Sequence, residues 1–205
     1  MRCCCGIFIA SFIPLKERCY AQQSINTVSS KEIIVGVCGG VAAFKTAGLV
    51  SQLVQQGFGV QTVMTRAATE FVGAQTFRAL TGRQVVTELF DPAFPLGAHI
   101  ELARAADVMC VAPATANFIA KAAHGIADDL LSTLYLCFTG TVIIAPAMNC
   151  EMWEKPAVQR NVKTLDGDGV QIIEPGEGWL SCRQKGKGRM AEPDQIFATI
   201  ETAAK

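Results

Sequence analysis

The chain has 205 residues, enough for one good-sized hydrophobic core, and its 18 basic and 18 acidic residues balance to a formal net charge of +0. Half of the residues are hydrophobic and 18% are charged, which excludes an intrinsically disordered chain and the basic surplus of a nucleic-acid-binding face. No apolar run approaches the roughly 20 residues of a membrane span. Composition therefore predicts a compact protein that binds neither nucleic acid nor membrane.

The first thirty residues differ from the rest of the chain. Arg2 precedes an apolar patch, residues 3–15, and three charged residues at 16–18 then interrupt it. We interpret residues 1–30 as an N-terminal extension that is either disordered or a targeting segment, such as a mitochondrial presequence. We expect the folded domain to span residues 31–205 and the protein to be cytoplasmic, unless residues 1–30 direct it elsewhere.

Five of the nine cysteines stand alone in the remaining chain, at positions 38, 110, 137, 150 and 182. No C-x-x-C pair is present and no histidine lies at metal-ligand spacing, so we expect no metal site. Cys110 and Cys137 lie inside apolar runs, which predicts that both are small core residues. This usage is typical of a reducing compartment.

From Lys31 onward, apolar strands alternate with amphipathic helices. The first strand, residues 33–37, leads through a glycine-rich turn into a helix at about 41–56. Further strands are expected at 60–64, 85–86, 108–112, 142–145 and 170–173. Further helices are expected at 67–80, 100–106, 118–123, 128–138, 155–165 and 193–204. A turn is expected at 113–117 and a long glycine-rich loop at 174–192. This alternation predicts a doubly wound, three-layer α/β/α sandwich with a parallel sheet, a Rossmann- or flavodoxin-like arrangement.

Three turns follow expected strands at the edge of the sheet where ligands bind. In Gly36-Val37-Cys38-Gly39-Gly40, glycines let the backbone approach a ligand, and the following helix presents unpaired N–H groups to an anion. The spacing is not G-x-G-x-x-G, so a mononucleotide phosphate or a tight turn without ligand is expected. Thr65-Arg66-Ala67 and Pro113-Ala114-Thr115-Ala116-Asn117 are likewise either ligand contacts or helix caps.

The segment Pro146-Ala147-Met148-Asn149-Cys150-Glu151-Met152-Trp153 follows a buried strand at the same edge. A neutral amide, thioethers and an indole in close succession suit an apolar pocket for a flat or sulfur-containing ligand. His99 directly precedes a helix and is the candidate general acid or base. His124 lies late in a helix, where a structural role is expected.

Residues 178–190 are rich in glycine and carry one thiol, Cys182, among four cations: Arg183, Lys185, Lys187 and Arg189. Neighbouring cations favour the thiolate and make the thiol a ready proton donor. A long loop in a compact domain is usually functional. A lid that closes over substrate is one interpretation, and a solvated basic loop is the other.

Taken in order, these segments resemble the flavin-containing cysteine decarboxylases, above all the phosphopantothenoylcysteine decarboxylases of coenzyme A synthesis, over about residues 33–205. Residues 113–117 are similar to the P-x-S-A-N-T flavin segment, 146–153 fit P-x-M-N-x-x-M-W, 182–193 resemble the substrate-clamp loop, and 99–102 match the histidine segment. Two departures are Cys38, where the family often carries serine, and Phe118, where it usually carries threonine.

The resemblance implies FMN as cofactor, with its phosphate near the first glycine turn. The implied flavin contacts are Gly39, Gly40, Val41, Thr65, Arg66, Ala67, Thr115, Ala116, Asn117, Phe118 and Met148. It also implies that N-(4′-phosphopantothenoyl)-cysteine loses carbon dioxide to give 4′-phosphopantetheine, after flavin oxidation of the thiol creates an electron sink beside the breaking bond. His99 would act in the oxidative and decarboxylative half, Asn149 would hold the carboxylate, and Cys182 would donate a proton.

Family sites resemble ones built between subunits, which implies a homo-oligomer, trimeric or trimer-based, with His99 reaching a neighbour's flavin. Because the chain ends at Lys205, the preceding synthetase would be a separate protein. The alternatives are a peptidyl-cysteine decarboxylase or a flavin prenyltransferase of the same fold, or a non-catalytic, phosphatase-regulating relative.

Overall fold

The structure is a computed structural model, and it describes residues 31–205. The interpretations of residues 1–30, an extension that is disordered or directs targeting, lie outside the described residues. Within residues 31–205, none of the helices combines the length and the apolar character that crossing a membrane requires. Cytoplasmic localisation stays a prediction.

A five-stranded sheet forms the centre of the molecule, with the strand order β2-β1-β3-β4-β5 and parallel pairing throughout. The strands are β1 (Glu32–Val37), β2 (Gly59–Met64), β3 (Val108–Ala114), β4 (Thr141–Pro146) and β5 (Gln171–Ile172). The chain leaves β1 toward β2 on one side and later returns to β3 on the other side. The strand order therefore reverses between β1 and β3, which makes this the topological switch point.

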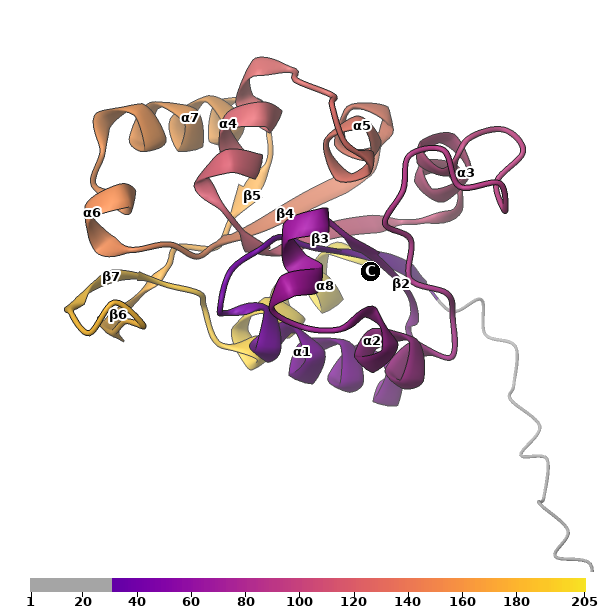
Figure 1. Cartoon of the computed structure of the whole chain (residues 1–205), viewed down its shortest axis with the longest axis horizontal. Helices are drawn as coiled ribbons and strands as arrows, with labels where there is room; N and C mark the ends of the chain where they lie inside the picture. Colours follow the sequence, from indigo (N-terminus) through magenta and orange to yellow (C-terminus); the bar gives the residue numbers. More distant parts are fainter. Residues whose placement is uncertain (1–30) are drawn as a thin grey trace, which may run out of the picture.

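Helices cover both faces of the sheet (Figure 1). One layer holds α1 (Ala43–Gln55), α2 (Ala74–Thr81) and α8 (Pro193–Ala203), and the other holds α3 (Ala98–Ala105), α4 (Ala116–His124), α5 (Leu130–Cys137) and α7 (Pro156–Gly167). Shorter elements are the 3-10 helix η1 (Arg66–Glu70), α6 (Cys150–Trp153) and an antiparallel hairpin of β6 (Gly176–Trp179) and β7 (Lys185–Arg189). The predicted three-layer, doubly wound α/β/α fold is confirmed.

The alternation of side chains along β1 explains why the strand is apolar throughout. Ile33, Val35 and Val37 enter the core beneath α1 and α8, whereas Ile34 enters the core on the other face. All four are at most 1% exposed, as expected for a central parallel strand that is buried on both sides. Each such side chain contributes about 1.5–3 kcal/mol through its burial.

Several expected elements differ in the structure. The helix expected at 67–80 is divided into η1 and α2, because Gly73 is extended at the α2 N-cap. Residues 85–86 form no strand and contribute only an isolated bridge between Val86 and Val63. The start of the turn expected at 113–117 was predicted wrongly, because strand β3 continues to Ala114 and includes the first two of these residues.

Two further expectations are wrong. The loop expected at 174–192 contains the β6–β7 hairpin, because pairing across it satisfies the backbone of a glycine-rich sequence that has no apolar periodicity. Cys137 is exposed rather than buried, because Phe138 fills the core position at the end of α5. Cys110 is buried, as predicted.

The cysteines should separate by reactivity. Burial raises the pKa of both Cys38 and Cys110 to about 12, while Cys137 and Cys182 are exposed. At about pH 8, we expect iodoacetamide to alkylate Cys137 and Cys182 in the native protein, and Cys38 and Cys110 only after unfolding, because the thiolate is the nucleophile. Mass spectrometry of the peptides measures this; alkylation of native Cys110 as fast as Cys182 would contradict it.

Candidate active site

A crevice of about 600 Å³ opens where β1, β3 and β4 end. Its walls are the turn Gly39–Gly40 after β1, Thr115 and Ala116 after β3, and Met148 and Asn149 after β4. The tip of the β6–β7 hairpin, residues 179–182, closes the remaining side. The crevice thus lies at the switch point of the sheet, outside the carboxyl ends of the strands.

The lining of the crevice is mainly apolar, with few polar groups. The apolar lining side chains include Val41, Phe44, Met148, Met152, Trp179, Leu180 and Met190. The uncharged polar side chains are Thr115, Asn149, Ser181 and Cys182, and the charged ones are Lys45 and Arg189. A site of this composition suits a small organic ligand or cofactor. Among residues 31–205, no group of three or more His, Cys, Asp or Glu residues could hold a metal ion.

The turn after β1 fits a phosphate group. A Cβ on Gly39 would lie 2.7 Å from the carbonyl carbon of Ala67, so glycine is required for the turn to pack on the segment after β2. Within residues 31–205, the backbone N–H groups of Gly39, Gly40 and Val41 donate no hydrogen bond. These free donors precede the N-terminus of α1, and such a combination binds phosphate.

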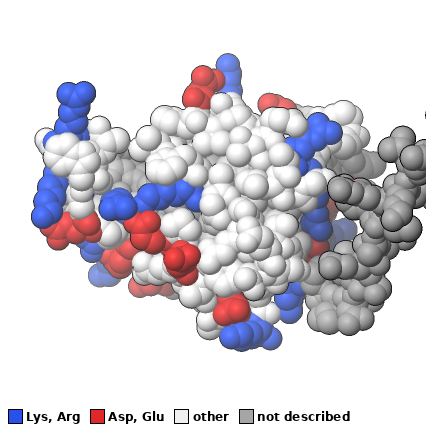
Figure 2. All heavy atoms as spheres, turned by 90° about the horizontal axis from the view of Figure 1, so that it is seen from below, with Lys and Arg blue, Asp and Glu red and all other residues white. Residues whose placement is uncertain are grey.

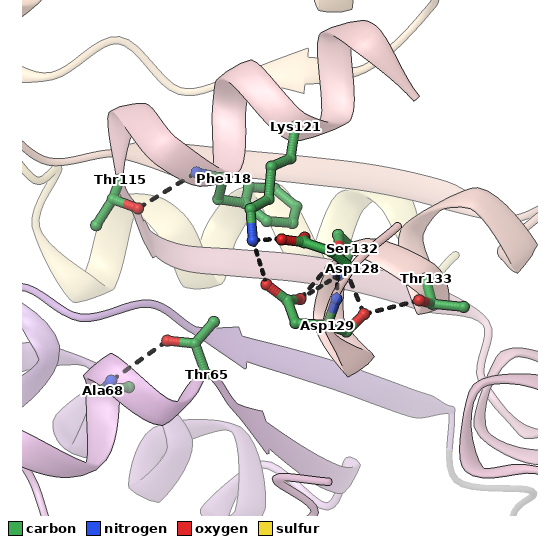
Figure 3. Close-up of polar contacts among 9 residues, drawn as sticks. All are labelled: Thr65, Ala68, Thr115, Phe118, Lys121, Asp128, Asp129, Ser132 and Thr133. Atoms are coloured by element: carbon green, nitrogen blue, oxygen red, sulfur yellow. Dashed lines mark hydrogen bonds and ion pairs between the residues drawn. The ribbon is translucent and has the colours of Figure 1, made fainter. Parts of the chain in front are cut away.

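Thr65 and Thr115 both serve as N-caps (Figure 3). The Oγ1 of Thr65 accepts from the N–H of Ala68 at 3.3 Å, and the Oγ1 of Thr115 accepts from the N–H of Phe118 at 3.4 Å. The helix-cap interpretation is confirmed for both. Thr115 also lines the crevice, whereas Thr65 does not.

Several residues expected to contact a ligand lie outside the crevice lining. Thr65, Arg66, Ala67 and Asn117 do not line it; Ala67 packs against the Gly39 turn, and Arg66 and Asn117 are exposed. Phe118 is 3% exposed and packs edge-on against Tyr135, with ring centroids 6.1 Å apart. The structure therefore brings Gly39, Gly40, Val41, Thr115, Ala116, Met148, Asn149 and Cys182 together around one cavity, and places Thr65, Arg66, Ala67, Asn117 and Phe118 outside its lining.

A charged network fastens α4 to the start of α5 beside this region (Figure 3). The Nζ of Lys121 lies 2.6 Å from Asp128 and 2.7 Å from Asp129, and Asp129 caps α5 by accepting from the N–H of Ser132 at 2.8 Å. Burial alone would raise the pKa of Asp129, but the hydrogen bonds from Lys121 and Ser132 outweigh it and hold the pKa below its ordinary value. Both partners stay charged, and α4 is held in place.

Asn149 begins the short helix α6 and caps it. Its Oδ1 accepts from the N–H of Met152 at 3.1 Å, which leaves the Nδ2 hydrogens as donors for a ligand. The carbonyl oxygen of Gly188 in β7 accepts from the N–H of Met148 at 2.9 Å. Strand β7 therefore lies directly on the segment that carries Asn149.

Two glycines of β7 make this contact possible. A Cβ on Gly186 would lie 2.8 Å from the Cβ of Cys150, and a Cβ on Gly188 would collide with the carbonyl oxygen of Met148. Gly188 also has φ +147°, which disfavours any side chain. The hairpin is thereby seated on residues 148–150 by backbone packing.

Cys182 lies in the turn of the hairpin, at the edge of the crevice. The N–H of Leu180 donates to the oxygen of Gln184 at 2.8 Å, and the N–H of Arg183 donates to the oxygen of Leu180 at 2.9 Å. Arg183 adopts φ 63°, the left-handed conformation that closes a three-residue hairpin turn. This tight turn presents the exposed Cys182 beside Ser181.

His99 is not in the crevice of its own chain. It lies in the first turn of α3, and its Nδ1 atom is buried without a hydrogen-bond partner in residues 31–205. Exposed apolar side chains precede it in the chain: Phe90 is 92% exposed and Leu96 is 63% exposed. His124 does not line the crevice. Its Nδ1 lies 2.9 Å from the carbonyl oxygen of Ala120 one turn earlier in α4, which agrees with a structural role.

None of the motifs in the sequence indicated Lys45 as a crevice residue. Lys45 follows Val41 by one helical turn, and this spacing would place both on one face of the helix expected at about 41–56. That signal was present in the sequence but is weak. Arg189 lies within residues 182–193, which resemble the substrate-clamp loop, but the motif did not distinguish it from the other cations as a lining residue.

A parallel, doubly wound sheet with an apolar crevice and free N–H donors at its switch point defines a class, the nucleotide-binding α/β proteins. Comparison with known proteins gives the particular family. The family model described as "Flavoprotein" matches residues 22–205, most of the chain. The chain belongs to the flavoprotein family.

Its relatives include the coenzyme A biosynthesis bifunctional protein CoaBC of Bacillus subtilis, 46% identical over 175 residues, and that of Haemophilus influenzae, 42% identical over 174 residues. These alignments cover 85% and 84% of this chain but 43% and 44% of the relatives. The chain thus spans less than half the length of these relatives.

Solved structures with the same fold include the FMN-dependent cysteine decarboxylase SpaF, with a TM-score of 0.76 and 39% identity over 85% of this chain and 98% of that one. A PPC decarboxylase mutant complexed with pantothenoylaminoethenethiol has a TM-score of 0.74 and 29% identity, covering 84% of this chain and 97% of that one.

Replacement of Gly188 should displace the β6–β7 hairpin from residues 148–150. We expect Gly188→Ala to lower the free energy of unfolding by about 1–3 kcal/mol, through the positive φ and the collision with Met148. It should also speed tryptic cleavage after Lys185 or Lys187. Gly57→Ala is the matched control, because Gly57 has φ +87° but open space around it. Equal tryptic cleavage rates in the two variants would contradict this role of Gly188.

Proposed function

We propose that residues 31–205 form an FMN-binding decarboxylase domain that converts N-(4′-phosphopantothenoyl)-cysteine to 4′-phosphopantetheine and carbon dioxide. The observation that carries the proposal is the joint placement of Asn149 and Cys182 at one apolar crevice, held by the packing of β7 on residues 148–150. The identity to CoaBC proteins and the likeness to a PPC decarboxylase structure support it.

The residues around the crevice suit FMN. The free N–H groups of Gly39, Gly40 and Val41 would bind its phosphate, and Thr115, Ala116 and Met148 would contact the rest of the molecule. Thr65, Arg66, Ala67, Asn117 and Phe118 lie outside the crevice lining, and their contacts with FMN stay a prediction. When bound, FMN would supply a reversible two-electron sink: electrons taken from the substrate thiol make the neighbouring C–C bond breakable, and the same two electrons return to the enethiol after carbon dioxide has left, so that the thiol is restored.

Asn149 would orient the substrate carboxylate through its Nδ2 hydrogens, because its Oδ1 is already engaged at the α6 N-cap. A neutral amide suits this task. It positions the carboxylate without strongly stabilising a charge that disappears in the reaction, so that binding does not lower the ground state.

Cys182 would donate the proton from its Sγ to the substrate carbon after carbon dioxide has left. Its place in the hairpin turn brings a donor to the open side of the crevice. Trp179 and Leu180 of the same hairpin would exclude water from the reacting atoms.

His99 would serve the crevice of a neighbouring subunit, in a homo-oligomer that is trimeric or trimer-based. Its position outside the crevice lining of its own chain and the exposure of Phe90 and Leu96, which precede it in the sequence, support this. Val41 and Phe44 at the crevice rim are also 52% and 63% exposed, and Figure 2 shows a broad uncharged area on the α1–α8 side. Exposed apolar side chains in an uncharged area suit subunit contact.

A second candidate is decarboxylation of a different cysteine-containing substrate by the same residues. The identity to SpaF, 39% over 98% of that chain, favours it. A flavin prenyltransferase or a phosphatase-regulating protein is less well supported, since His99, Asn149 and Cys182 are all present. If the first candidate holds, we propose that a synthetase activity supplies the substrate.

The decisive measurement combines absorbance with product analysis. We expect the purified chain to carry a flavin spectrum and to release carbon dioxide from phosphopantothenoylcysteine. Cys182→Ser should still release it but accumulate the oxidised enethiol product, because the proton donor is missing. Normal turnover by Cys182→Ser would show that Cys182 is not the proton donor. A protein that cannot be loaded with FMN would refute the whole proposal.

Mixing two inactive variants tests the placement of His99. His99→Asn and Cys182→Ser are each expected to lack full turnover. After subunit exchange at equal concentrations, about a quarter of the sites should combine an intact Cys182 with a partner's intact histidine, and activity should return to about that fraction. Native mass spectrometry verifies that the subunits have exchanged. If activity does not recover despite exchange, His99 either acts in the crevice of its own chain or takes no part in the reaction.

A further inference from the structure

Lys45 and Arg189 stand out because they are the charged side chains that line the crevice within residues 31–205. Both are cations, while the remaining lining is apolar or neutral. Lys45 projects from α1, and its side chain is only 14% exposed. Arg189 is the last residue of β7, and its side chain is 45% exposed. A crevice with this charge distribution favours an anionic ligand.

Glu192 joins the two cations. The Nζ of Lys45 lies 3.1 Å from both carboxylate oxygens of Glu192, and the Nη2 of Arg189 lies 2.7 Å from Oε1. Glu192 itself does not line the crevice, and its side chain is 57% exposed. Two cations sharing one carboxylate leave an excess positive charge, and an exposed carboxylate can be displaced by a more highly charged anion.

The chemistry of the proposed substrate supplies such an anion. Its carboxylate is assigned to Asn149, a neutral donor, so its phosphate monoester has no partner yet. A phosphate carries a charge of about −2 near neutral pH and offers oxygens to both a lysine and a guanidinium. We propose that Lys45 and Arg189 form a subsite for the substrate's phosphate monoester, with Glu192 as the counter-ion that it displaces. This rests on the function proposed above and names the residues that select phosphorylated substrates.

The test compares phosphopantothenoylcysteine with its unphosphorylated analogue, pantothenoylcysteine. We expect Lys45→Met to lower kcat/KM for the phosphorylated substrate by roughly 10- to 100-fold, the range of a charged hydrogen bond, and to leave the unphosphorylated one nearly unchanged. Arg189→Met should act in the same direction. Lys163→Met, at an exposed lysine of α7 outside the crevice, is the control and should change neither.

Glu192→Gln separates a direct role from a structural one. It removes the same ion pairs but keeps both cations, so the preference for the phosphorylated substrate should persist. If Glu192→Gln and Lys45→Met lose that preference alike, the three residues only hold the hairpin against α1, and the subsite proposal is wrong.

The flavin phosphate is the other phosphate monoester that these cations could bind. The FMN content of each purified variant, measured by absorbance after denaturation, distinguishes the two. Unchanged FMN content supports the proposal, whereas loss of FMN together with equal losses on both substrates would overturn it in favour of the cofactor.

Measurements on the wild-type protein distinguish a wrong assignment of the reaction from a wrong assignment of the phosphate subsite. If the wild-type protein decarboxylates both substrates equally well, the subsite is refuted while decarboxylation stands. If it decarboxylates neither, calorimetric titration with 4′-phosphopantetheine and with pantetheine still decides. Tighter binding of the phosphorylated compound that Lys45→Met abolishes would support the subsite, and equal binding would refute it.

Discussion

Gly186 and Gly188 let strand β7 lie directly on the backbone of residues 148–150, and the arrangement of the whole crevice depends on this contact. One side of the crevice is made of strand ends and helix starts that belong to the sandwich. The other side is a small hairpin whose attachment includes this backbone packing and the hydrogen bond from Met148 to Gly188. A side chain at either glycine would separate Cys182 from Asn149, because the strand would have to move outward.

The sandwich supplies the rest of the site through its topology. Strands β1 and β3 are neighbours, but the chain departs from them toward opposite faces of the sheet, and so a crevice opens between the turns that follow them. The paired charges of Lys121 and Asp129 keep α4 and α5 together beside it (Figure 3). Glycine at position 39 allows the first turn to pack on Ala67 while its N–H groups remain available for a ligand.

The elements that could be predicted are those with a local signature. Apolar runs such as residues 33–37 and 142–145 identified central strands, because parallel strands buried on both faces need apolar side chains throughout. The β6–β7 hairpin had no such signature. Its strands are rich in glycine and lysine, and they form because of pairing and of packing against α6. Cys137 was assigned to the core from its apolar neighbours, and the helix turns it outward instead.

The sequence by itself determined the doubly wound fold and the chemical character of the crevice, since hydrophobic periodicity, turn glycines and the segments around Asn149 and Cys182 are local properties of the chain. Only the tertiary structure decided that Ala67 packs behind the Gly39 turn, that His99 lies outside the crevice lining, and that Lys45 lines it together with Arg189. These placements depend on contacts between distant segments, as between Lys45 and Glu192, which are 147 residues apart. Such contacts are set by how the layers pack, and no local pattern of residues encodes them.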